Sequence, residues 1–385
     1  MTANYYYCML QKRLLLIAFL CYGATLAAQI KVTIIVDKLP AFQNSDPVYV
    51  AGNFNSWNPS DNSFKLKQQP GGEWQSVINS QKDNILEFKF TRGAWTKVEC
   101  TAEGKDLGNH SLKVAGDTTL RYTIGGWQDA FAPKSKRHTA SAQVQVMDSA
   151  FKLKALGRDR RIWIYLPKDY ATSKKRYPVL YMHDGQNLFD EFTAGYGEWG
   201  VDELLDAYFD ETKKSCIVIG IDNGTKRMTE YDPYDNERFG KGEGKAYVQS
   251  IVESLKPFVD KRYRTIKDAS NTWIAGSSMG GIISQWAVMA YPKVFGKAGI
   301  FSPAFWVAPA FKTDVSSMMK GYAGELYFYS GEKESKTMVP DMDSVMMKVK
   351  GVSKAALIRS VTADGQHNEQ NWNRVFPEFM KMVFE

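Results

Sequence analysis

Residues 271–281 read "NTWIAGSSMGG" and place a serine at an abrupt change in the character of the chain. An apolar run ends at Gly276, and the amphipathic segment "IISQWAVMA" begins directly after Gly281. This order fits a strand, a tight turn and a helix, and such a turn needs glycine where a side chain would collide with neighbouring backbone. The pattern G-x-S-x-G at 276–280 therefore predicts that Ser278 stands clear of a sheet, on a sharp strand-to-helix turn.

A serine in this position is a candidate nucleophile, because the free amides and the dipole at the start of a helix favour developing negative charge. Its hydroxyl becomes reactive only when a base accepts its proton, and in this strand order a histidine late in the chain supplies the base. His367, in "TADGQHNEQNW", follows the last expected strand and is the predicted base. The alternative is a histidine that only caps the last helix.

The other three histidines receive different interpretations. His110 and His138 lie in the first domain or in a linker, and we expect solvent around both side chains. His183 and its neighbour Asp184 precede the serine in the chain, so we interpret them as residues that shape a loop.

A carboxylate should orient the histidine and stabilise its charged form. The segment "GELYFYSGEKESKTMVPDMD", between the serine and the histidine, offers Glu332, Glu334 and Asp341. Glu334 stands three residues beyond Gly331 and can fold back over the end of the preceding strand, whereas Glu332 begins the turn and should point outward. Glu334 is the predicted acid, with Asp341 as the alternative.

A serine that attacks an ester carbonyl also needs two amides directed at the incipient oxyanion. Met279, directly after the serine, offers one of them. The second should come from the loop after the strand in "YPVLYMHDGQN", where Gly185 lets the backbone turn toward the serine. Gln186 is the predicted donor, with Gly185 as the next candidate.

The composition limits the other functions. The 385 residues are 44% apolar and 13% aromatic, which is typical of a folded protein with a substantial core. The net charge of +7 comes from 49 basic and 42 acidic residues without a long block of one sign, so no nucleic-acid partner is expected. With four histidines and no paired cysteine spacing, we expect no metal site and no cofactor. Cys100 and Cys216 fall in different expected domains, which argues against a disulfide.

The N-terminus has the order of a secretory signal peptide. Lys12 and Arg13 precede the apolar stretch "LLLIAFLCYGATLAAQ", and small residues stand near Ala28. We expect residues 1–28 to be removed on export, because the apolar run is shorter than the ~20 residues that span a bilayer. The predicted location is therefore the periplasm or the outside of the cell, without stable membrane insertion after cleavage.

Two domains and a linker follow from the strand and helix patterns. Residues 29–127 hold five short strand-like segments, "IKVTIIVDKL", "PVYVAG", "EWQSVI", "LEFKFTRG" and "TLRYTI", which predict a small all-β, immunoglobulin-like sandwich. Residues 128–143 are polar and contain proline, as linkers do. From 144 to 385, apolar strands alternate with helical segments, which predicts a mostly parallel sheet with helices on both faces.

The second domain carries the segments "YPVLYMHDGQNLFD", "WGVDELL", "GIDNGTKRMTEYDP", "GSSMGG" and "HNEQNW" in that order, over about residues 145–385. These motifs resemble the putative esterase family of α/β-hydrolases. That family includes feruloyl and acetyl xylan esterases, S-formylglutathione hydrolases, enterobactin-type siderophore esterases and mycolyltransferases. The resemblance implies a catalytic triad of Ser278, Glu334 and His367, with the two amides named above as the oxyanion hole.

In the first domain, "VYVAGNFNSWNP" followed by "LEFKFTRGAWTKVE" is similar to starch- and glycogen-binding modules. The resemblance places Trp57 and Trp95 on the positions that stack against sugar rings in those modules. An exposed indole face can cover the apolar face of a pyranose, so this use is physically reasonable. The alternative is that both tryptophans pack inside the sandwich or against the second domain, in a module that is purely structural.

Export, the sugar-module resemblance and the esterase resemblance together favour a secreted serine esterase that acts on carbohydrate-linked esters, such as acetyl or feruloyl groups of plant polysaccharide. The expected partner is thus a polysaccharide or oligosaccharide ester. One alternative is an esterase of enterobactin-type trilactones, which cationic residues near the serine, such as Arg227, would favour. The other is a carbohydrate-binding protein whose hydrolase domain does not catalyse.

Overall fold

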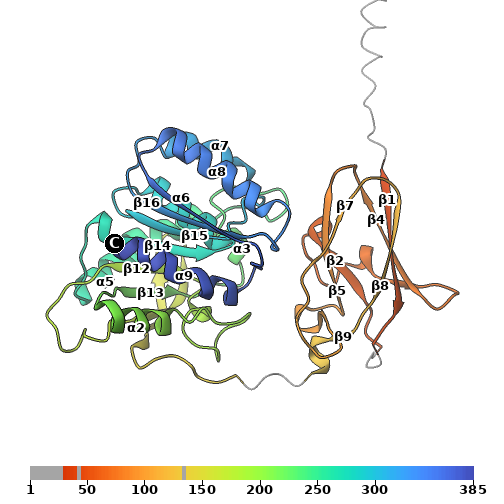
Figure 1. Cartoon of the computed structure of the whole chain (residues 1–385), viewed down its shortest axis with the longest axis horizontal. Helices are drawn as coiled ribbons and strands as arrows, with labels where there is room; N and C mark the ends of the chain where they lie inside the picture. Colours follow the sequence, from red (N-terminus) through yellow and green to blue (C-terminus); the bar gives the residue numbers. More distant parts are fainter. Residues whose placement is uncertain (1–28, 41–44, 132–135) are drawn as a thin grey trace, which may run out of the picture. The chain divides into compact units, whose positions relative to one another are not determined.

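The structure, a computed structural model, describes residues 29–40, 45–131 and 136–385 (Figure 1). The chain divides into two compact units, residues 1–134 and residues 135–385. The predicted signal peptide, residues 1–28, lies outside the described residues. Among the helices of the described ranges, none is both long and apolar enough to cross a membrane.

The N-terminal unit contains strands and single turns of 3-10 helix in its described residues. Strands β1, β2, β4, β5 and β8 lie in the five segments that the sequence predicts, and the short strands β3, β6, β7 and β9 are additional. The strands are β1 (Ile30–Lys38), β2 (Tyr49–Gly52), β3 (Lys67–Gln68), β4 (Trp74–Ser80), β5 (Ile85–Thr91), β6 (Glu99–Cys100), β7 (His110–Lys113), β8 (Thr118–Thr123) and β9 (Gly126–Trp127). The 3-10 turns are η1 (Asn53–Asn55), η2 (Asn62–Phe64), η3 (Trp95–Lys97) and η4 (Gln128–Ala130).

These strands form three small sheets, with the orders β3-β4-β1-β8, β2-β5-β7 and β6-β9. Alternate residues of β5, namely Leu86, Phe88 and Phe90, are buried, which is the two-residue period of a strand with one face on a core. Val32 and Ile34 of β1 belong to the same apolar cluster. The N-terminal unit therefore has a core of its own.

His110 departs from the expectation of a solvated histidine. It lies on β7, and its Nε2 is 3.0 Å from both carboxylate oxygens of the buried Glu99. Its ring also packs against Phe88 and Tyr122. The expectation is wrong for His110, because pairing with a buried carboxylate offsets the cost of removing the imidazole from water. His138, by contrast, is exposed.

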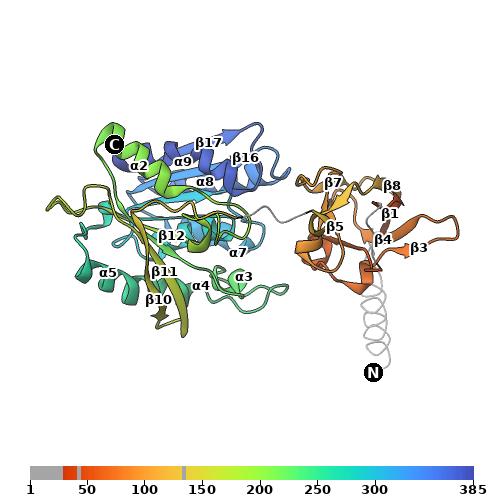
Figure 2. The ribbon, with the colours of Figure 1, turned by 90° about the horizontal axis from the view of Figure 1, so that it is seen from below.

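The C-terminal unit contains one eight-stranded sheet with the order β10-β11-β13-β12-β14-β15-β16-β17 (Figures 1 and 2). Strand β11 pairs antiparallel with β10 and with β13, and the remaining neighbours are parallel. The sheet is therefore mostly parallel, as the sequence predicts, with an antiparallel edge formed by β10 and β11. Its strands are β10 (Val144–Leu153), β11 (Arg158–Tyr165), β12 (Val179–His183), β13 (Ile217–Ile221), β14 (Thr272–Ser277), β15 (Lys297–Phe301), β16 (Glu325–Gly331) and β17 (Ala356–Thr362).

Helices pack on both faces of this sheet, because its central strands are apolar on both sides. In β11, Ile162 and Ile164 belong to one buried cluster, whereas Trp163 and Tyr165 belong to another. The first cluster includes residues of α4 to α8, and the second includes residues of α2 and α9. The helices are α2 (Val201–Thr212), α3 (Arg227–Glu230), α4 (Gly244–Ser250), α5 (Lys256–Arg262), α6 (Met279–Ala290), α7 (Pro309–Met318), α8 (Met338–Val352) and α9 (Glu369–Phe384). Between them lie the 3-10 turns η5 (Gly185–Asn187) and η7 (Ala269–Asn271) and the π-helical turn η6 (Ile251–Leu255).

The carboxyl ends of β14, β15, β16 and β17 lie along one edge of the sheet, because these strands are parallel neighbours. The register pairs Ser277 with Phe301 and Phe301 with Tyr329, and Tyr329 in turn with Ser360. The segments that follow these four strands therefore lie at the same edge, although they are far apart in the sequence.

Candidate active site

Ser278 sits between β14 and α6 in a backbone conformation that non-glycine residues rarely adopt. It is the N-cap of α6, with φ 59° and ψ −118°. Residues at positive φ carry strain, and functional sites are where such strain is usually found. Ser278 therefore occupies the sharp strand-to-helix turn that its sequence pattern predicts.

The glycines around this turn differ in how strictly they are required. A Cβ at position 276 would lie 2.8 Å from Cδ2 of His183 and 3.0 Å from the backbone of Gly280. At Gly281 it would lie 3.0 Å from the carbonyl oxygen of Phe301, whereas at Gly280 the nearest atom is 3.4 Å away. The turn thus depends most on Gly276, where His183 lies directly behind it.

The backbone of Ser278 is well anchored, and its side chain is partly exposed. Its amide donates to the carbonyl of Phe301 at 2.9 Å, and its own carbonyl accepts from the amides of Gly281 and Ala304. In the described part of the chain, its hydroxyl makes no hydrogen bond, including none to His367. In a protein without substrate, catalytic hydrogen bonds are often long and tighten only when the substrate binds.

His367 and Glu334 are in direct contact. His367 Nδ1 lies 2.8 Å from Glu334 Oε2. The Glu334 side chain is 0% exposed, and its Oε1 accepts from the Gly331 amide and the Ser302 hydroxyl, both at 2.6 Å. Three hydrogen bonds therefore fix this carboxylate, so that Nδ1 of the imidazole is held as a donor and Nε2 is the nitrogen free for chemistry.

The two other acids considered from the sequence do not take this position. Glu332 is exposed, as expected for a residue that begins the turn. Asp341, on α8, forms an ion pair with Lys312 of α7. Of the three candidates, Glu334 alone is hydrogen-bonded to His367 in the described residues.

Two residues that the sequence analysis did not identify support this pair. Trp372 packs edge-to-face against the ring of His367 at 5.2 Å, and its Nε1 donates to the Ser302 hydroxyl at 2.8 Å. Ser302 follows β15 with φ 44° and connects Trp372 to Glu334. Two sequence features could have pointed to them: the tryptophan five residues after the histidine in "HNEQNW", and the serine directly after the strand in "KAGIFSP".

The two predicted oxyanion amides have no hydrogen-bond partner within the described ranges. Met279 is the first residue of α6, where an amide has no partner inside the helix. Gln186 lies in η5; its side chain accepts from the Asn223 amide at 3.1 Å and its carbonyl accepts from Thr193 at 2.8 Å. A Cβ on Gly185 would lie 2.7 Å from the backbone of Gly220, so this turn needs glycine.

His183 and Asp184 are buried beside the serine turn and pair with other residues. His183 Nδ1 lies 2.8 Å from the Tyr247 hydroxyl, and burial lowers the pKa of the imidazole to about 3, so it is neutral. Asp184 accepts two hydrogen bonds of 2.7 Å from Arg227. Although burial opposes ionisation of Asp184, Arg227 and Asn223 together hold the pKa of this carboxyl below its usual value. These contacts agree with the interpretation that both residues shape the loop.

Comparison with known proteins assigns the chain to a family. The sequence profile described as "Putative esterase" matches residues 154–381, which is more than half of the chain. The chain therefore belongs to the putative esterase family. The uncharacterized protein YbbA of Bacillus subtilis is 27% identical over 213 residues, which cover 54% of this chain and 81% of YbbA.

Two further proteins carry names that bear on activity. The endo-1,4-beta-xylanase/feruloyl esterase of Xylanibacter ruminicola is 22% identical over 244 residues, 62% of this chain but only 31% of that protein. The crystal structure of the enterobactin esterase FES from Shigella flexneri matches 93% of this chain and 94% of its own, with a TM-score of 0.53 and 14% identity, a likeness of fold. Membership of the putative esterase family supports a carboxylic ester hydrolase, whereas the likeness to FES concerns the fold alone.

Proposed function

We propose that this protein is a secreted serine esterase that removes acyl groups from carbohydrate, with Ser278 as nucleophile, His367 as base and Glu334 as the orienting acid. The observation that carries the proposal is the 2.8 Å contact between His367 and Glu334, at the sheet edge where Ser278 occupies a strained turn. A nucleophile, a base and a group that orients the base are the parts that acyl transfer requires.

In the first step, the Ser278 hydroxyl oxygen attacks the ester carbonyl while His367 Nε2 accepts its proton. The carbonyl oxygen becomes an oxyanion, which the free amides of Met279 and Gln186 stabilise. Glu334 stabilises the imidazolium that forms. The carbon–oxygen bond to the sugar then breaks, His367 returns the proton to the leaving alcohol, and an acyl-serine remains.

In the second step, water takes the place of the alcohol. His367 accepts a proton from the water as its oxygen attacks the acyl-serine, and the same two amides stabilise the second oxyanion. Collapse of this intermediate releases the carboxylic acid and returns the proton to Ser278. Over the cycle, the leaving alcohol takes the proton of Ser278, and Ser278 regains a proton from the water, in both cases through His367.

Carbohydrate as the leaving group is favoured by the N-terminal unit. Trp57 and Trp95 lie side by side there, with ring centroids 6.2 Å apart and planes inclined by 45°. Trp95 is 37% exposed and Trp57 is partly buried, so neither ring belongs to the core. Adjacent indole faces can stack on successive sugar rings, as the resemblance to sugar-binding modules implies. The xylanase/feruloyl esterase is named for chemistry of the same kind.

The trilactone alternative is favoured by the match to FES over both units of this chain. Ferric catecholate complexes are strongly anionic, so such a site would need uncompensated cations near the serine. Arg227, the candidate from sequence, is paired with Asp184 through two hydrogen bonds, which neutralises its charge. We therefore place the trilactone second.

The mechanism is tested with two neighbouring serines. Ser278→Ala should reduce kcat on p-nitrophenyl acetate by about 10⁴-fold or more, because the nucleophile is lost. Ser277→Ala, one residue earlier, should keep activity within a few-fold. Equal rates for wild type and Ser278→Ala would exclude Ser278 as nucleophile, and an inactive wild type would support the carbohydrate-binding alternative.

Two neighbouring acids test the role of Glu334. Glu334→Gln preserves shape but cannot stabilise an imidazolium, so kcat should fall by about 10²–10⁴-fold with little change in KM. Glu332→Gln, at an exposed position, should leave kcat unchanged. A larger loss of kcat in Glu332→Gln than in Glu334→Gln would show that Glu334 is not the orienting acid.

Substrate class and export need separate measurements. Rates on acetylated xylan, methyl ferulate and a ferric trilactone distinguish the two esterase proposals, and rapid cleavage of the trilactone alone would overturn the carbohydrate assignment. Export is tested by N-terminal sequencing of protein from the periplasm and the medium, where a mature chain should begin near residue 29. Recovery of the intact N-terminus from the cytoplasm alone would contradict secretion.

A further inference from the structure

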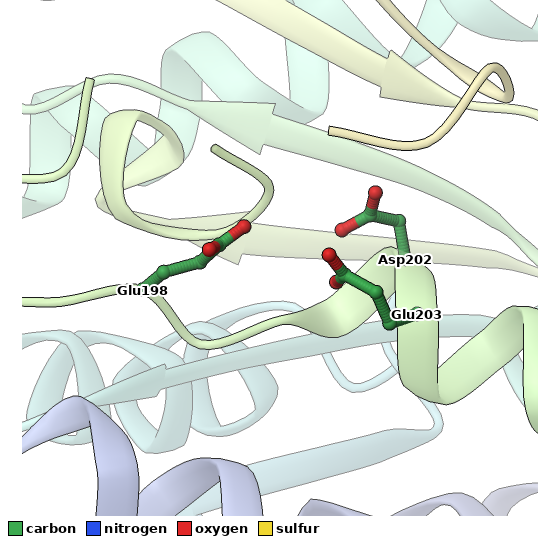
Figure 3. A group of neighbouring side chains, drawn as sticks. All are labelled: Glu198, Asp202 and Glu203. Atoms are coloured by element: carbon green, nitrogen blue, oxygen red, sulfur yellow. The ribbon is translucent and has the colours of Figure 1, made fainter. Parts of the chain in front are cut away.

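Three carboxylates converge at the start of α2. Oxygens of Glu198, Asp202 and Glu203 lie within 4.8 Å of one another, and Figure 3 shows the three carboxyl groups pointing toward a common space. In the described part of the chain, no lysine, arginine or histidine forms an ion pair with any of the three. Their mutual repulsion is therefore not compensated by a basic side chain.

Asp202 is buried and only partly hydrogen-bonded, which is a second observation beside the clustering of the acids. This residue is 0% exposed, and its Oδ2 accepts from the Ser141 amide at 2.6 Å, whereas Oδ1 has no hydrogen-bond partner. Oε1 of Glu198 and Oγ of Ser141 are likewise buried without a partner. Because buried polar atoms are almost always satisfied, an unpartnered carboxylate oxygen directed into the cluster calls for a neutralising group, which is either a proton shared between carboxyl groups or a bound cation.

The amides at the start of α2 do not hydrogen-bond to Oδ1 of Asp202. Free amides at a helix start can stabilise carboxylates. Here the Val201 amide donates to the carbonyl of Leu188, and the Leu204 amide donates to that of Gly200. Oδ1 of Asp202 receives neither.

We propose that Glu198, Asp202 and Glu203 bind one divalent cation of the calcium class. Calcium takes six to eight oxygen ligands at about 2.3–2.6 Å, so ligands on opposite sides of the ion are about 5 Å apart. Separations within 4.8 Å fit this geometry. Three protein carboxylates also favour calcium over magnesium, which usually keeps several waters and is bound through only one or two carboxylates. Glu203 is exposed, so the ion and its water ligands can reach the site from solvent.

The proposed ion connects two segments of the C-terminal unit. On one side, the Thr139 hydroxyl donates to Glu198 at 2.8 Å and the Ser141 amide donates to Asp202. On the other side, the Trp199 amide donates to the carbonyl of Asn187, next to the predicted oxyanion amide. Bound cation should therefore stabilise both the segment before β10 and the loop after η5.

This proposal departs from the sequence expectation of no metal site. That expectation considered histidine and cysteine ligands, which suit zinc. The set at 198, 202 and 203 contains only carboxylates, and the stretch "EWGVDE" has no spacing that distinguishes ligands from ordinary surface acids. The inference does not rest on the proposed substrate or triad.

The test uses the full mature chain after removal of metal with EGTA. Unfolding temperature is measured in CaCl2, in MgCl2 and in NaCl of equal ionic strength, and calcium binding is measured by isothermal titration calorimetry. We expect one calcium per chain, and a rise in Tm of about 5 °C at a hundredfold excess over Kd.

Two variants and one matched control complete the test. Glu203→Gln changes an exposed ligand that folding can tolerate, and together with Glu198→Gln it should remove both the rise in Tm and the calorimetric binding. Glu211→Gln, an exposed acid in the last turn of the same helix, should keep both. The site would be overturned if calcium still raised the Tm of the double variant, or if CaCl2 raised the Tm of the wild type no more than NaCl does. Shared protons would then be the groups that neutralise the carboxylates. An equal rise in MgCl2 would overturn the calcium class.

Discussion

Glu369 is a single residue whose ionisation should be visible in the stability of the whole unit. It is 6% exposed at the start of α9, and its Oε1 accepts from the Asn187 side chain at 3.2 Å. Burial, and then the negative charge of Asp184, raise the pKa of this carboxyl to about 7, against the opposing effects of its own backbone amide, of the His367 ring and of Arg227. Glu369 thereby joins the helix that follows His367 to the turn that carries Gln186.

The raised pKa of Glu369 predicts a stability that falls as pH rises. Between its unfolded value of 4.5 and about 7, the native state holds more protons than the unfolded state, so the free energy of unfolding decreases with pH across this window. Across this window, the contribution of Glu369 to the free energy of unfolding falls by about 3 kcal/mol. Urea denaturation from pH 4 to 8 should show Glu369→Gln gaining stability over wild type as pH rises, whereas Glu211→Gln should follow wild type. Parallel curves for wild type and Glu369→Gln would contradict the prediction.

At the scale of an element, the turn between β14 and α6 has no room for a side chain at Gly276. Gly276→Ala would place a methyl group 2.8 Å from His183, a buried ring that is itself bonded to Tyr247. We expect a loss of about 1–3 kcal/mol in the free energy of unfolding, because a packed site must shift to admit the methyl group. The activity should fall as well, since the shift displaces the serine turn.

A second glycine provides the control for Gly276→Ala. Gly351 lies in α8, and a Cβ there would meet no atom within 4 Å. Gly351→Ala should therefore stabilise the protein by about 0.4–1 kcal/mol, through the reduced freedom of the unfolded chain. Thermal unfolding of both variants measures the contrast. A Gly276→Ala protein as stable and active as wild type would show that the turn does not depend on this glycine.

The elements that the sequence predicts well are those whose signal is local. Ser278, Glu334 and His367 each follow an apolar strand of a parallel sheet, so chemistry and chain order alone are enough to propose them as a site. Strand β10 was not predicted because the segment "VQVMDSAFKL" does not alternate regularly between apolar and polar residues, and irregularities interrupt its pairing with β11. The prediction of a mostly parallel sheet did not say where its antiparallel strands lie.

Contacts between distant residues explain the rest of what was missed. Trp372 and Ser302 meet behind the histidine, and serine and tryptophan are residue types without a distinctive spacing. The pair of His110 and Glu99 joins two strands whose register cannot be derived from composition. In each case, the sequence supplied the residue and only the three-dimensional fold supplied its partner.

At the scale of the molecule, the chain has separate cores in its two units. One apolar cluster contains residues between Val32 and Trp127, and two others contain residues between Leu153 and Val383. Because each unit buries its own apolar surface, a substitution on the surface of one should leave the fold of the other intact. The proposed binding to glycan and the proposed hydrolysis of esters should therefore be separable by substitution.

The tryptophan pair tests this separation. Trp57→Ala and Trp95→Ala each remove one stacking face, so each should weaken retention on insoluble xylan or starch by about three- to tenfold, and the double variant should lose most retention. The rate on p-nitrophenyl acetate, which needs only the C-terminal unit, should stay at the wild-type value and serves as the internal control. The rate on insoluble acetylated xylan should fall, because the substrate is no longer held near the enzyme. Unchanged retention in the double variant would make the N-terminal unit a scaffold and remove its support for a carbohydrate substrate.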